Sequence, residues 1–253
     1  MNKDPLLDFT DQVVLITGAA SGFGATLAEN FSQRGAKLIL GDINESGLER
    51  IAASLPGDAT TVICDVTKEA DCAAMVDAAK EIYGRLDIAI NNAGAGHNLG
   101  PIHTLTEEIF DQQFALNTKG VFFGMKYQIA QMLKQEGGGR ILNVSSMAGV
   151  GAAPRIGAYS AAKHAVVGIT KTAAVEYAKK NILVNVVCPF FTLTPLFTDS
   201  ELVESTDFLA QGSPMKRLGQ PEEITNVMLM LCSPGNSYMT GQTIAVDGGV
   251  SAF

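Results

Sequence analysis

Short apolar, β-branched runs recur along the chain and alternate with longer stretches of helical periodicity. Nearly continuous apolar runs of this kind are typical of strands that are covered on both faces, as in a parallel sheet. The runs occupy residues 13–17, 37–40, 61–64, 86–90, 141–144, 183–187 and 243–246. The pattern therefore predicts a buried parallel sheet.

The helical stretches lie between these runs, which is the order of a doubly wound α/β fold with right-handed crossovers. They cover residues 23–34, 45–54, 68–83, 106–135, 157–180 and 221–232. No linker, repeat or low-complexity tract interrupts the alternation. We expect one domain over 1–253, with a parallel sheet of about seven strands and helices on both faces.

One connection, residues 189–216, is long for a compact α/β domain. Long connections are usually functional lids or poorly ordered segments. This one contains several phenylalanines and leucines, which makes it too apolar for a disordered linker. We expect it to cover a substrate.

The composition argues against several classes of function. A net charge of −8 leaves neither a basic face for nucleic acid nor a polybasic patch for an anionic membrane. No apolar run has the length of a membrane span, and the N-terminus lacks the apolar core of a signal peptide, so a cytoplasmic protein is expected. The cysteines and histidines are scattered without ligand spacing, so reduced thiols and no metal site are expected.

A glycine-rich turn follows the first apolar run and precedes the first helical stretch. Glycines permit a tight turn and let the backbone approach a pyrophosphate, which the free N–H groups of the next helix can bind. Many strand–helix loops contain glycine for steric reasons alone, but this turn stands where the phosphate-binding mechanism needs it. The candidate residues are Gly18, Ser21, Gly22, Phe23 and Gly24.

Asp42 ends the second apolar run, about twenty residues beyond the glycine turn. A carboxylate there can accept hydrogen bonds from the adenosine ribose hydroxyls and repel a 2′-phosphate. No Arg or Lys stands beside Asp42, so NAD is favoured over NADP. The alternative interpretation is an acidic helix N-cap leading into Asn44 and Glu45.

Tyr159 and Lys163 stand four residues apart in a helical stretch, so both side chains can point at one spot. A lysine ammonium beside a phenol favours the phenolate and lowers the pKa of the tyrosine. Taken alone, such a pair is more often a solvated helix face. The other motifs of the chain give it weight.

Together with Asn91-Asn92-Ala93-Gly94 after the fourth strand, the glycine turn and the Tyr159–Lys163 pair resemble the short-chain dehydrogenases/reductases. The resemblance runs from about residue 10 to about residue 250 and includes segments 217–223 and 240–249. It implies a Rossmann fold and reversible hydride transfer between NAD(H) and a secondary alcohol/ketone pair. It also implies a homotetramer built on helices 106–135 and 157–180, whose Ala-rich faces packing within the chain would explain equally well.

The resemblance also assigns catalytic roles. Tyr159 becomes the acid/base, and Lys163 lowers its pKa and binds the nicotinamide ribose. Ser146, thirteen residues before Tyr159, binds the reacting oxygen; Ser145 is disfavoured because successive strand side chains point oppositely. Asn117 resembles the asparagine that holds a relay water, although a mid-helix Asn is often merely tolerated.

Further cofactor contacts follow from the same resemblance. Beyond the glycine turn and Asp42 they are Asp65, Val66, Asn92, Gly94, Tyr159, Lys163, Pro189, Thr192 and Thr194. The chain departs from the family at Phe190, where most relatives have glycine. Either the loop takes another path there or the ring narrows the substrate pocket.

An apolar pocket with few cations suits a neutral aliphatic, alicyclic or aryl alcohol. Its expected lining is His97, Met147, Phe190, Phe191, Leu196 and Phe197. The first alternative is a 3-oxoacyl-[acyl-carrier-protein] reductase, but Gly137 and Val175 stand where such reductases carry arginines. The second is a catalytically silent NAD sensor or scaffold.

Overall fold

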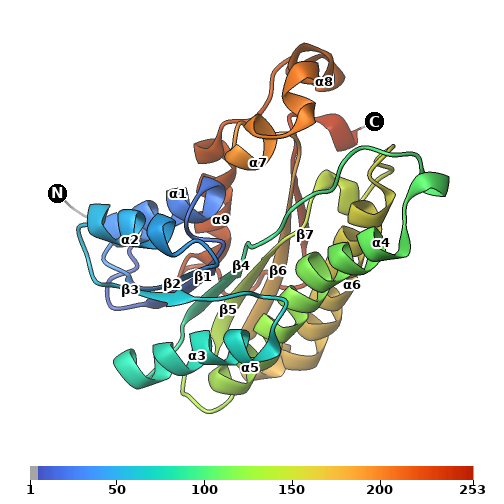
Figure 1. Cartoon of the computed structure of the whole chain (residues 1–253). Coiled ribbons are helices and arrows are strands. Elements are labelled where there is room, and N and C mark those ends of the chain that lie inside the picture. The colour runs from blue at the N-terminus through green and yellow to red at the C-terminus, as the bar shows by residue number, and fades with distance from the viewer. Residues whose placement is uncertain (1–4, 253) are drawn as a thin grey trace.

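Seven parallel strands form the central sheet of the computed structural model, which describes residues 5–252 (Figure 1). The strand order is β3-β2-β1-β4-β5-β6-β7, so the chain reverses direction across the sheet between β1 and β4. The strands are β1 Val13–Thr17, β2 Lys37–Asp42, β3 Ala59–Ile63, β4 Ile88–Asn91, β5 Gly139–Val144, β6 Ile182–Pro189 and β7 Thr243–Val246. Ligands of such sheets bind at this reversal, beyond the carboxyl ends of the strands.

Helices cover both faces of the sheet, as the alternation predicts (Figure 1). On one face, α1 (Gly22–Gln33), α2 (Glu45–Ser54) and α9 (Pro221–Cys232) pack on strand residues such as Val14 and Ile16. On the other, α3 (Glu69–Tyr83), α5 (Gly120–Met132) and α6 (Gly157–Tyr177) pack on Val13 and Leu15. Because successive strand side chains point to opposite faces, two separate cores form.

The prediction that every strand is covered on both faces is wrong for the two edge strands. In β3, Thr61 and Ile63 are exposed, and in β7 Ala245 is exposed. The flanking helices reach across the middle of the sheet but leave these edges partly open. Only the central strands have the full burial that the apolar runs predict.

The long helical stretch predicted over 106–135 consists of three consecutive segments. Thr106 caps α4 (Glu107–Phe114), which leads through a π-helical turn, Ala115–Lys119, into α5. A π turn inserts an extra residue into the helical path and rotates the side chains that it carries. Asn117 lies in this turn.

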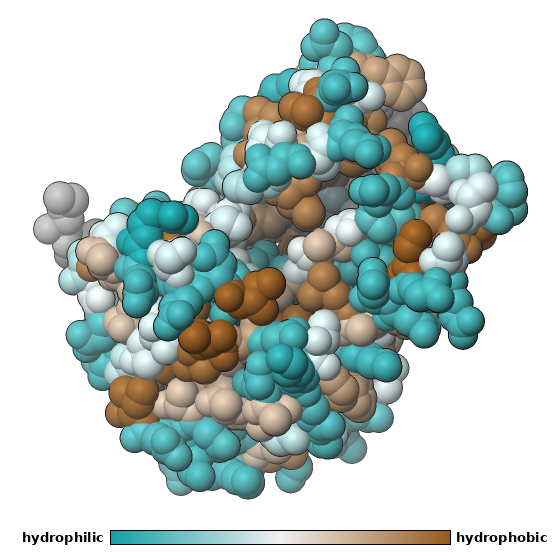
Figure 2. All heavy atoms as spheres, in the orientation of Figure 1, coloured by the Kyte–Doolittle hydropathy of each residue, from teal (hydrophilic) through white to brown (hydrophobic). Residues whose placement is uncertain are grey.

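The connection 189–216 is largely helical. It contains α7 (Pro195–Thr198), a 3₁₀ turn (Glu201–Ser205) and α8 (Thr206–Gly212), and Figure 1 shows it projecting beyond the sheet. Figure 2 shows the molecule hollowed below this projection. Its base is packed, with Phe197 buried, whereas Phe208 in α8 is 79% exposed. Within residues 5–252, no helix combines the length and apolarity needed to cross a bilayer.

Candidate active site

The glycine turn lies at the carboxyl end of β1 and opens into α1, as predicted. Gly18 and Gly22 have φ angles of +67° and +53°, a region that strongly favours glycine. A Cβ at Gly24 would lie 2.0 Å from the carbonyl oxygen of Gly18, so the helix can start this close to the turn only with glycine there. Ser21 is the N-cap of α1 but its side chain makes no capping hydrogen bond, which leaves the first N–H groups of the helix available.

Two polar side chains hold this turn in place. Asn92 Nδ2 donates to the carbonyl oxygens of Thr17 at 3.0 Å and Gly18 at 3.2 Å. Asp42 Oδ2 accepts from the N–H of Ala20 at 3.0 Å, and Asp42 Oδ1 accepts from the N–H of Asn44 at 3.0 Å. The N-cap of α2 is Asn44, which accepts from the N–H of Gly47 at 3.0 Å. The alternative interpretation of Asp42 as the helix cap is therefore wrong.

Ser146, Tyr159 and Lys163 come together between the end of β5 and the start of α6. The Ser146 hydroxyl lies close enough to the Tyr159 hydroxyl to lower its pKa, and Lys163 Nζ lies 5.5 Å from the centre of the Tyr159 ring. Lys163 is buried and donates from Nζ to the carbonyl oxygen of Val144 at 2.9 Å. Ser145 points the other way and donates to the carbonyl oxygen of Lys163 at 2.8 Å, as strand alternation predicts.

Burial controls the protonation of this pair. It raises the pKa of Tyr159 to about 12, against a smaller lowering by the hydrogen bond from Ser146. Burial also lowers the pKa of Lys163 to about 8. The expectation that the pKa of Tyr159 lies near neutrality is thus wrong for the protein alone, because desolvation of the phenolate is the largest effect on this pKa.

The lowered pKa of Lys163 gives a pH-dependent prediction for stability. Below about pH 8 the lysine is charged in both states, and the folded state bears the full cost of burying the charge. Between about 8 and 10.5 the unfolded state holds more protons, so the free energy of unfolding rises with pH. We expect Lys163→Met to raise the free energy of unfolding at pH 7 by about 1–3 kcal/mol and to lose this gain near pH 10.5. Urea unfolding of the nucleotide-free protein at both pH values measures it; an equal gain at both would contradict the assignment.

Asn117 faces Lys163 across Gly94. Asn117 is fully buried, and its Oδ1 has no hydrogen-bond partner within the described chain. A methyl group added at Gly94 would lie 2.7 Å from Asn117 Oδ1 and 3.2 Å from Lys163 Nζ. Because one added carbon would touch both atoms, they lie within reach of a single bridging water. Sequence reasoning missed Gln113, which is buried and accepts from Asn117 Nδ2 at 3.0 Å; its only signal was the spacing of four residues.

The segment after β6 resolves the question posed by Phe190. Phe190 donates its N–H to the carbonyl oxygen of Val246 at 3.1 Å, continuing the β6–β7 pairing of Pro189 with Val246, and its φ is not positive. The loop therefore accommodates a side chain without strain. The ring packs edge-on against Phe191 at 4.8 Å, and Phe191 lies 5.9 Å from Phe197.

Phe190 and Phe191 line a cavity of about 120 Å³ together with Met215, Ile224 and Val246. None of the described residues Ser146, Tyr159 and Lys163 borders this cavity. Phe190 and Phe191 were expected to line the substrate pocket. They lie instead on this separate cavity, at the base of the 189–216 connection. Leu196, in contrast, is 54% exposed on the same connection.

The remaining predicted contacts are spread around the same edge of the sheet. Thr194 is buried, and a Cβ at Gly22 would lie 3.6 Å from it, so Thr194 borders the glycine turn. The Thr192 hydroxyl donates to the carbonyl oxygen of Phe190. Asp65 is engaged within its own loop, accepting from Thr67, and Val66 is largely buried. His97 Nδ1 lies 2.7 Å from the carbonyl oxygen of Asn98, while its Nε2 is buried without a described partner. Met147 is half-buried beside Ser146.

Comparison with known proteins shows which family has this arrangement. The family model described as enoyl-(acyl carrier protein) reductase matches residues 18–251. Levodione reductase of Leifsonia aquatica is 35% identical, over 99% of this chain and 98% of its own, and cyclohexanol dehydrogenase of Acinetobacter sp. is 36% identical over 95% of each chain. The structure of a 3-ketoacyl-(acyl-carrier-protein) reductase from Brucella melitensis complexed with NADH has a TM-score of 0.90 and 36% identity, covering 96% of this chain and 99% of its own. The chain therefore belongs to the short-chain dehydrogenase/reductase family, oxidoreductases that use a nicotinamide cofactor and act on alcohols and ketones.

Proposed function

We propose that the protein is an NAD-dependent dehydrogenase of hydrophobic secondary alcohols, with Tyr159 as its acid/base. The observation that carries the proposal is the convergence of Ser146 and Tyr159 beside the buried Lys163, whose Nζ lies 5.5 Å from the centre of the tyrosine ring. A hydroxyl pair at this place can bind the oxygen of an alcohol or ketone from two sides. The glycine turn lies at the same edge of the sheet and would bind the pyrophosphate of the cofactor.

The described residues fit a dinucleotide. Gly18, Gly22 and Gly24 would leave the start of α1 open for the pyrophosphate, and Thr194 lies beside Gly22. Asp42 would accept hydrogen bonds from the adenosine ribose hydroxyls. Asp65 and Val66 lie nearby, after the end of β3, and Asn92 holds the glycine turn. Gly94, Pro189 and Thr192 complete the proposed cofactor contacts. When bound, the oxidised nicotinamide supplies the hydride acceptor and a positive charge.

Within the chain, Ser146 would orient the alcohol oxygen and Tyr159 would take its proton. Because burial raises the pKa of Tyr159 to about 12, the phenolate needs a favourable charge beside it. Lys163 can supply that charge and pass protons onward. Asn117 Oδ1, a buried acceptor within one water of Lys163 Nζ, would hold the water that exchanges protons with the lysine.

Cofactor choice would rest on Asp42. Its carboxylate would repel a 2′-phosphate and accept from ribose hydroxyls, and hydrogen bonds to charged groups contribute about 1.5–3 kcal/mol. We expect Asp42→Ala to lower the ratio of kcat/KM for NAD to that for NADP by about 10- to 100-fold. Initial rates with both nucleotides measure the ratio. A wild-type protein that prefers NADP would overturn the assignment.

The substrate would be a neutral alcohol. The expected lining, with Met147, Leu196 and Phe197, is mostly apolar, and His97 Nε2 is a buried polar atom in the same set. A relative named cyclohexanol dehydrogenase supports an alicyclic substrate. The connection 189–216 would cover it, because its exposed apolar residues Leu196 and Phe208 lie on a projection above the hollow.

The alternative within the family is reduction of 3-oxoacyl-[acyl-carrier-protein], the activity named for a Thermotoga maritima relative that is 38% identical. An acidic carrier would need a basic surface at its docking site. Val175 is 82% exposed and Gly137 is an uncharged turn residue where arginines would be expected, which favours the free alcohol.

The experiment that tests the proposal is a panel of secondary alcohols and ketones with NADH absorbance as readout. Alcohol-dependent NADH formation, strongest with alicyclic or aryl substrates, is expected. NADPH-dependent reduction of an acetoacetyl thioester without alcohol oxidation would support the carrier-protein alternative. Binding of NAD without turnover of any substrate would support a sensor or scaffold.

We also propose a homotetramer that uses the outer faces of α4–α5 and α6. Phe110, Phe122 and Val175 on these helices and Leu133, the C-cap of α5, are exposed apolar residues. The Ala-rich faces are a weaker argument, because Ala158, Ala162, Ala173 and Ala174 are buried within the chain. A monomeric mass by light scattering would contradict the proposal.

A further inference from the structure

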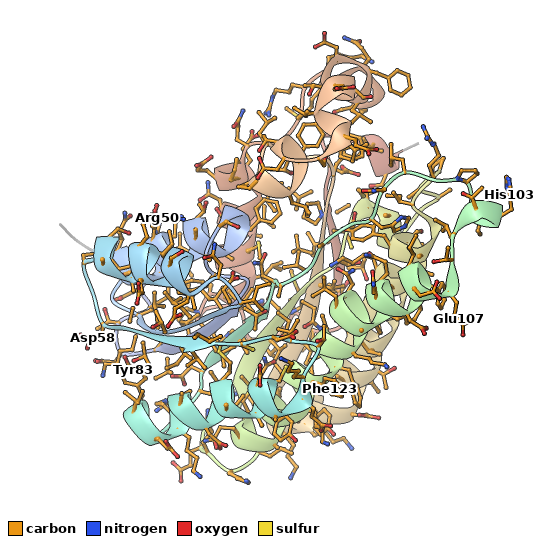
Figure 3. The ribbon with its side chains drawn as sticks, in the orientation of Figure 1. Arg50, Asp58, Tyr83, His103, Glu107 and Phe123 are labelled. Carbon is orange, nitrogen blue, oxygen red and sulfur yellow. The ribbon has the colours of Figure 1, made fainter. Side chains whose placement is uncertain are left out.

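Gln113 is a buried amide in the last turn of α4, four residues before Asn117. It is 5% exposed, whereas its neighbour Gln112 points to solvent. Figure 3 labels Glu107 in the first turn of this helix, which leads inward to the π turn that carries Asn117. Side chains four residues apart meet on one helix face, so Gln113 can reach Asn117.

Two backbone carbonyl groups determine the orientation of the Gln113 and Asn117 side-chain amides, that is, which end of each carries the NH₂ group. Gln113 Nε2 donates to the carbonyl oxygen of Gly96 at 3.2 Å, and Asn117 Nδ2 donates to that of Ala95 at 2.9 Å. A carbonyl oxygen can only accept, so each side chain must present its NH₂ group there. Gln113 Oε1 is then left to accept the second hydrogen of Asn117 Nδ2, at 3.0 Å.

The consequence for Asn117 is a single orientation of its amide. Both hydrogens of Nδ2 are used, and Oδ1 is the free atom. This acceptor and Lys163 Nζ both lie within contact distance of the position that a Cβ at Gly94 would occupy. If the amide were reversed, two donor hydrogens would face the lysine ammonium instead, and the pair could not share a water that accepts from Lys163 and donates to Asn117.

The same glutamine ties down the loop after β4. Its bond to Gly96 holds the backbone between Gly94, which lies against Asn117 and Lys163, and His97, whose Nε2 is buried without a described partner. A Cβ added at Gly96 would have no atom within 4 Å, so the loop is open on that side of the residue. The hydrogen bond from Gln113 links this loop directly to α4, beside the bond that Asn117 donates to Ala95 from the π turn.

We propose that Gln113 is a positioning residue with two separable effects, orienting the Asn117 amide toward Lys163 and fixing the 94–97 loop over the substrate. This inference rests on the proposed function for its kinetic consequences. The Asn117 bond acts on proton transfer and therefore on kcat. The Gly96 bond acts on the substrate-facing loop and therefore on KM for the alcohol.

Three variants test the two effects. Gln113→Met keeps the length and apolar body of the side chain and removes both hydrogen bonds; Gln112→Met is the matched control on the exposed side. Gln113→Glu, assayed in the alkaline range where the carboxylate is ionised, keeps an acceptor for Asn117 but has no hydrogen for Gly96. Relative to Gln112→Met, we expect Gln113→Met to lower kcat by about 10- to 100-fold and to raise KM. Gln113→Glu should raise KM while retaining most of kcat.

Two readouts do not depend on turnover. Hydrogen exchange of residues 94–98 should be faster in Gln113→Met than in the control, and the side-chain ¹⁵N amide resonance of Asn117 should move. If exchange, resonance, kcat and KM all match the control, the proposal is wrong. Equal loss of kcat in Gln113→Met and Gln113→Glu would refute the separate orienting effect. A wild type that oxidises no alcohol would overturn the proposed function, while the exchange and resonance measurements would still decide the role of Gln113.

Discussion

Replacement of Tyr159 by phenylalanine is expected to lower kcat for alcohol oxidation by about 100- to 10,000-fold. The variant keeps the ring but removes the hydroxyl, which lies beside Ser146 and whose pKa is raised to about 12 by burial. NADH binding, followed by the fluorescence of the bound nucleotide, should stay within about threefold of wild type, because the glycine turn and Asp42 are untouched.

The control is Tyr177→Phe, at the other end of the same helix. It should leave kcat unchanged. Normal turnover by Tyr159→Phe would show that another group exchanges the proton and would end the proposed mechanism. Loss of nucleotide binding along with activity would instead indicate a general disturbance of α6.

A methyl group at Gly94 is expected to be almost as damaging. The added Cβ would lie 2.7 Å from Asn117 Oδ1 and 3.2 Å from Lys163 Nζ, so one or both must shift. Overpacking of this kind costs about 1–3 kcal/mol of stability, and a displacement of about 1 Å at a catalytic group can cost about 100-fold in rate. We therefore expect Gly94→Ala to reduce kcat/KM by about 100-fold.

Gly96→Ala is the matched control, two residues along the same loop. Nothing lies within 4 Å of its added Cβ, and its φ is not in the positive range. It should fold as well as wild type and keep its activity. Equal activity of Gly94→Ala and Gly96→Ala would show that the space between Asn117 and Lys163 has no part in the reaction.

Much of the fold could be predicted because its signals are repetitive. Each central strand is a short apolar run, and each flanking helix separates two such runs, so β1, β4, β5 and β6 follow from periodicity alone. The edge strands differ because burial depends on neighbours, which periodicity does not report. Ile63 is apolar yet 57% exposed, since β3 has a strand on one side only.

The placement of the candidate site residues was predictable where a motif combines residue type with a required spacing. Ser146, Tyr159 and Lys163 meet as expected because a strand end and the start of a helix converge there. Gln113 could not be found in this way, because a polar residue in a helix is ordinarily solvated, and only the tertiary position of Gly96 makes it a donor. The direction of the Tyr159 pKa was also out of reach, since it depends on how much water the fold excludes.

The hydrogen bond from Ala20 to Asp42 bears on how cofactor use could be changed by evolution or by design. The carboxylate that would discriminate against a 2′-phosphate also holds the middle of the glycine turn, so a single substitution alters charge and backbone support together. Replacing Asp42 by alanine would remove the repulsion of a 2′-phosphate together with both acceptors, whereas asparagine keeps one oxygen for the N–H of Ala20 without the negative charge. A lineage that moves from NAD to NADP would thus pass more easily through asparagine, with a basic residue added beside it afterwards.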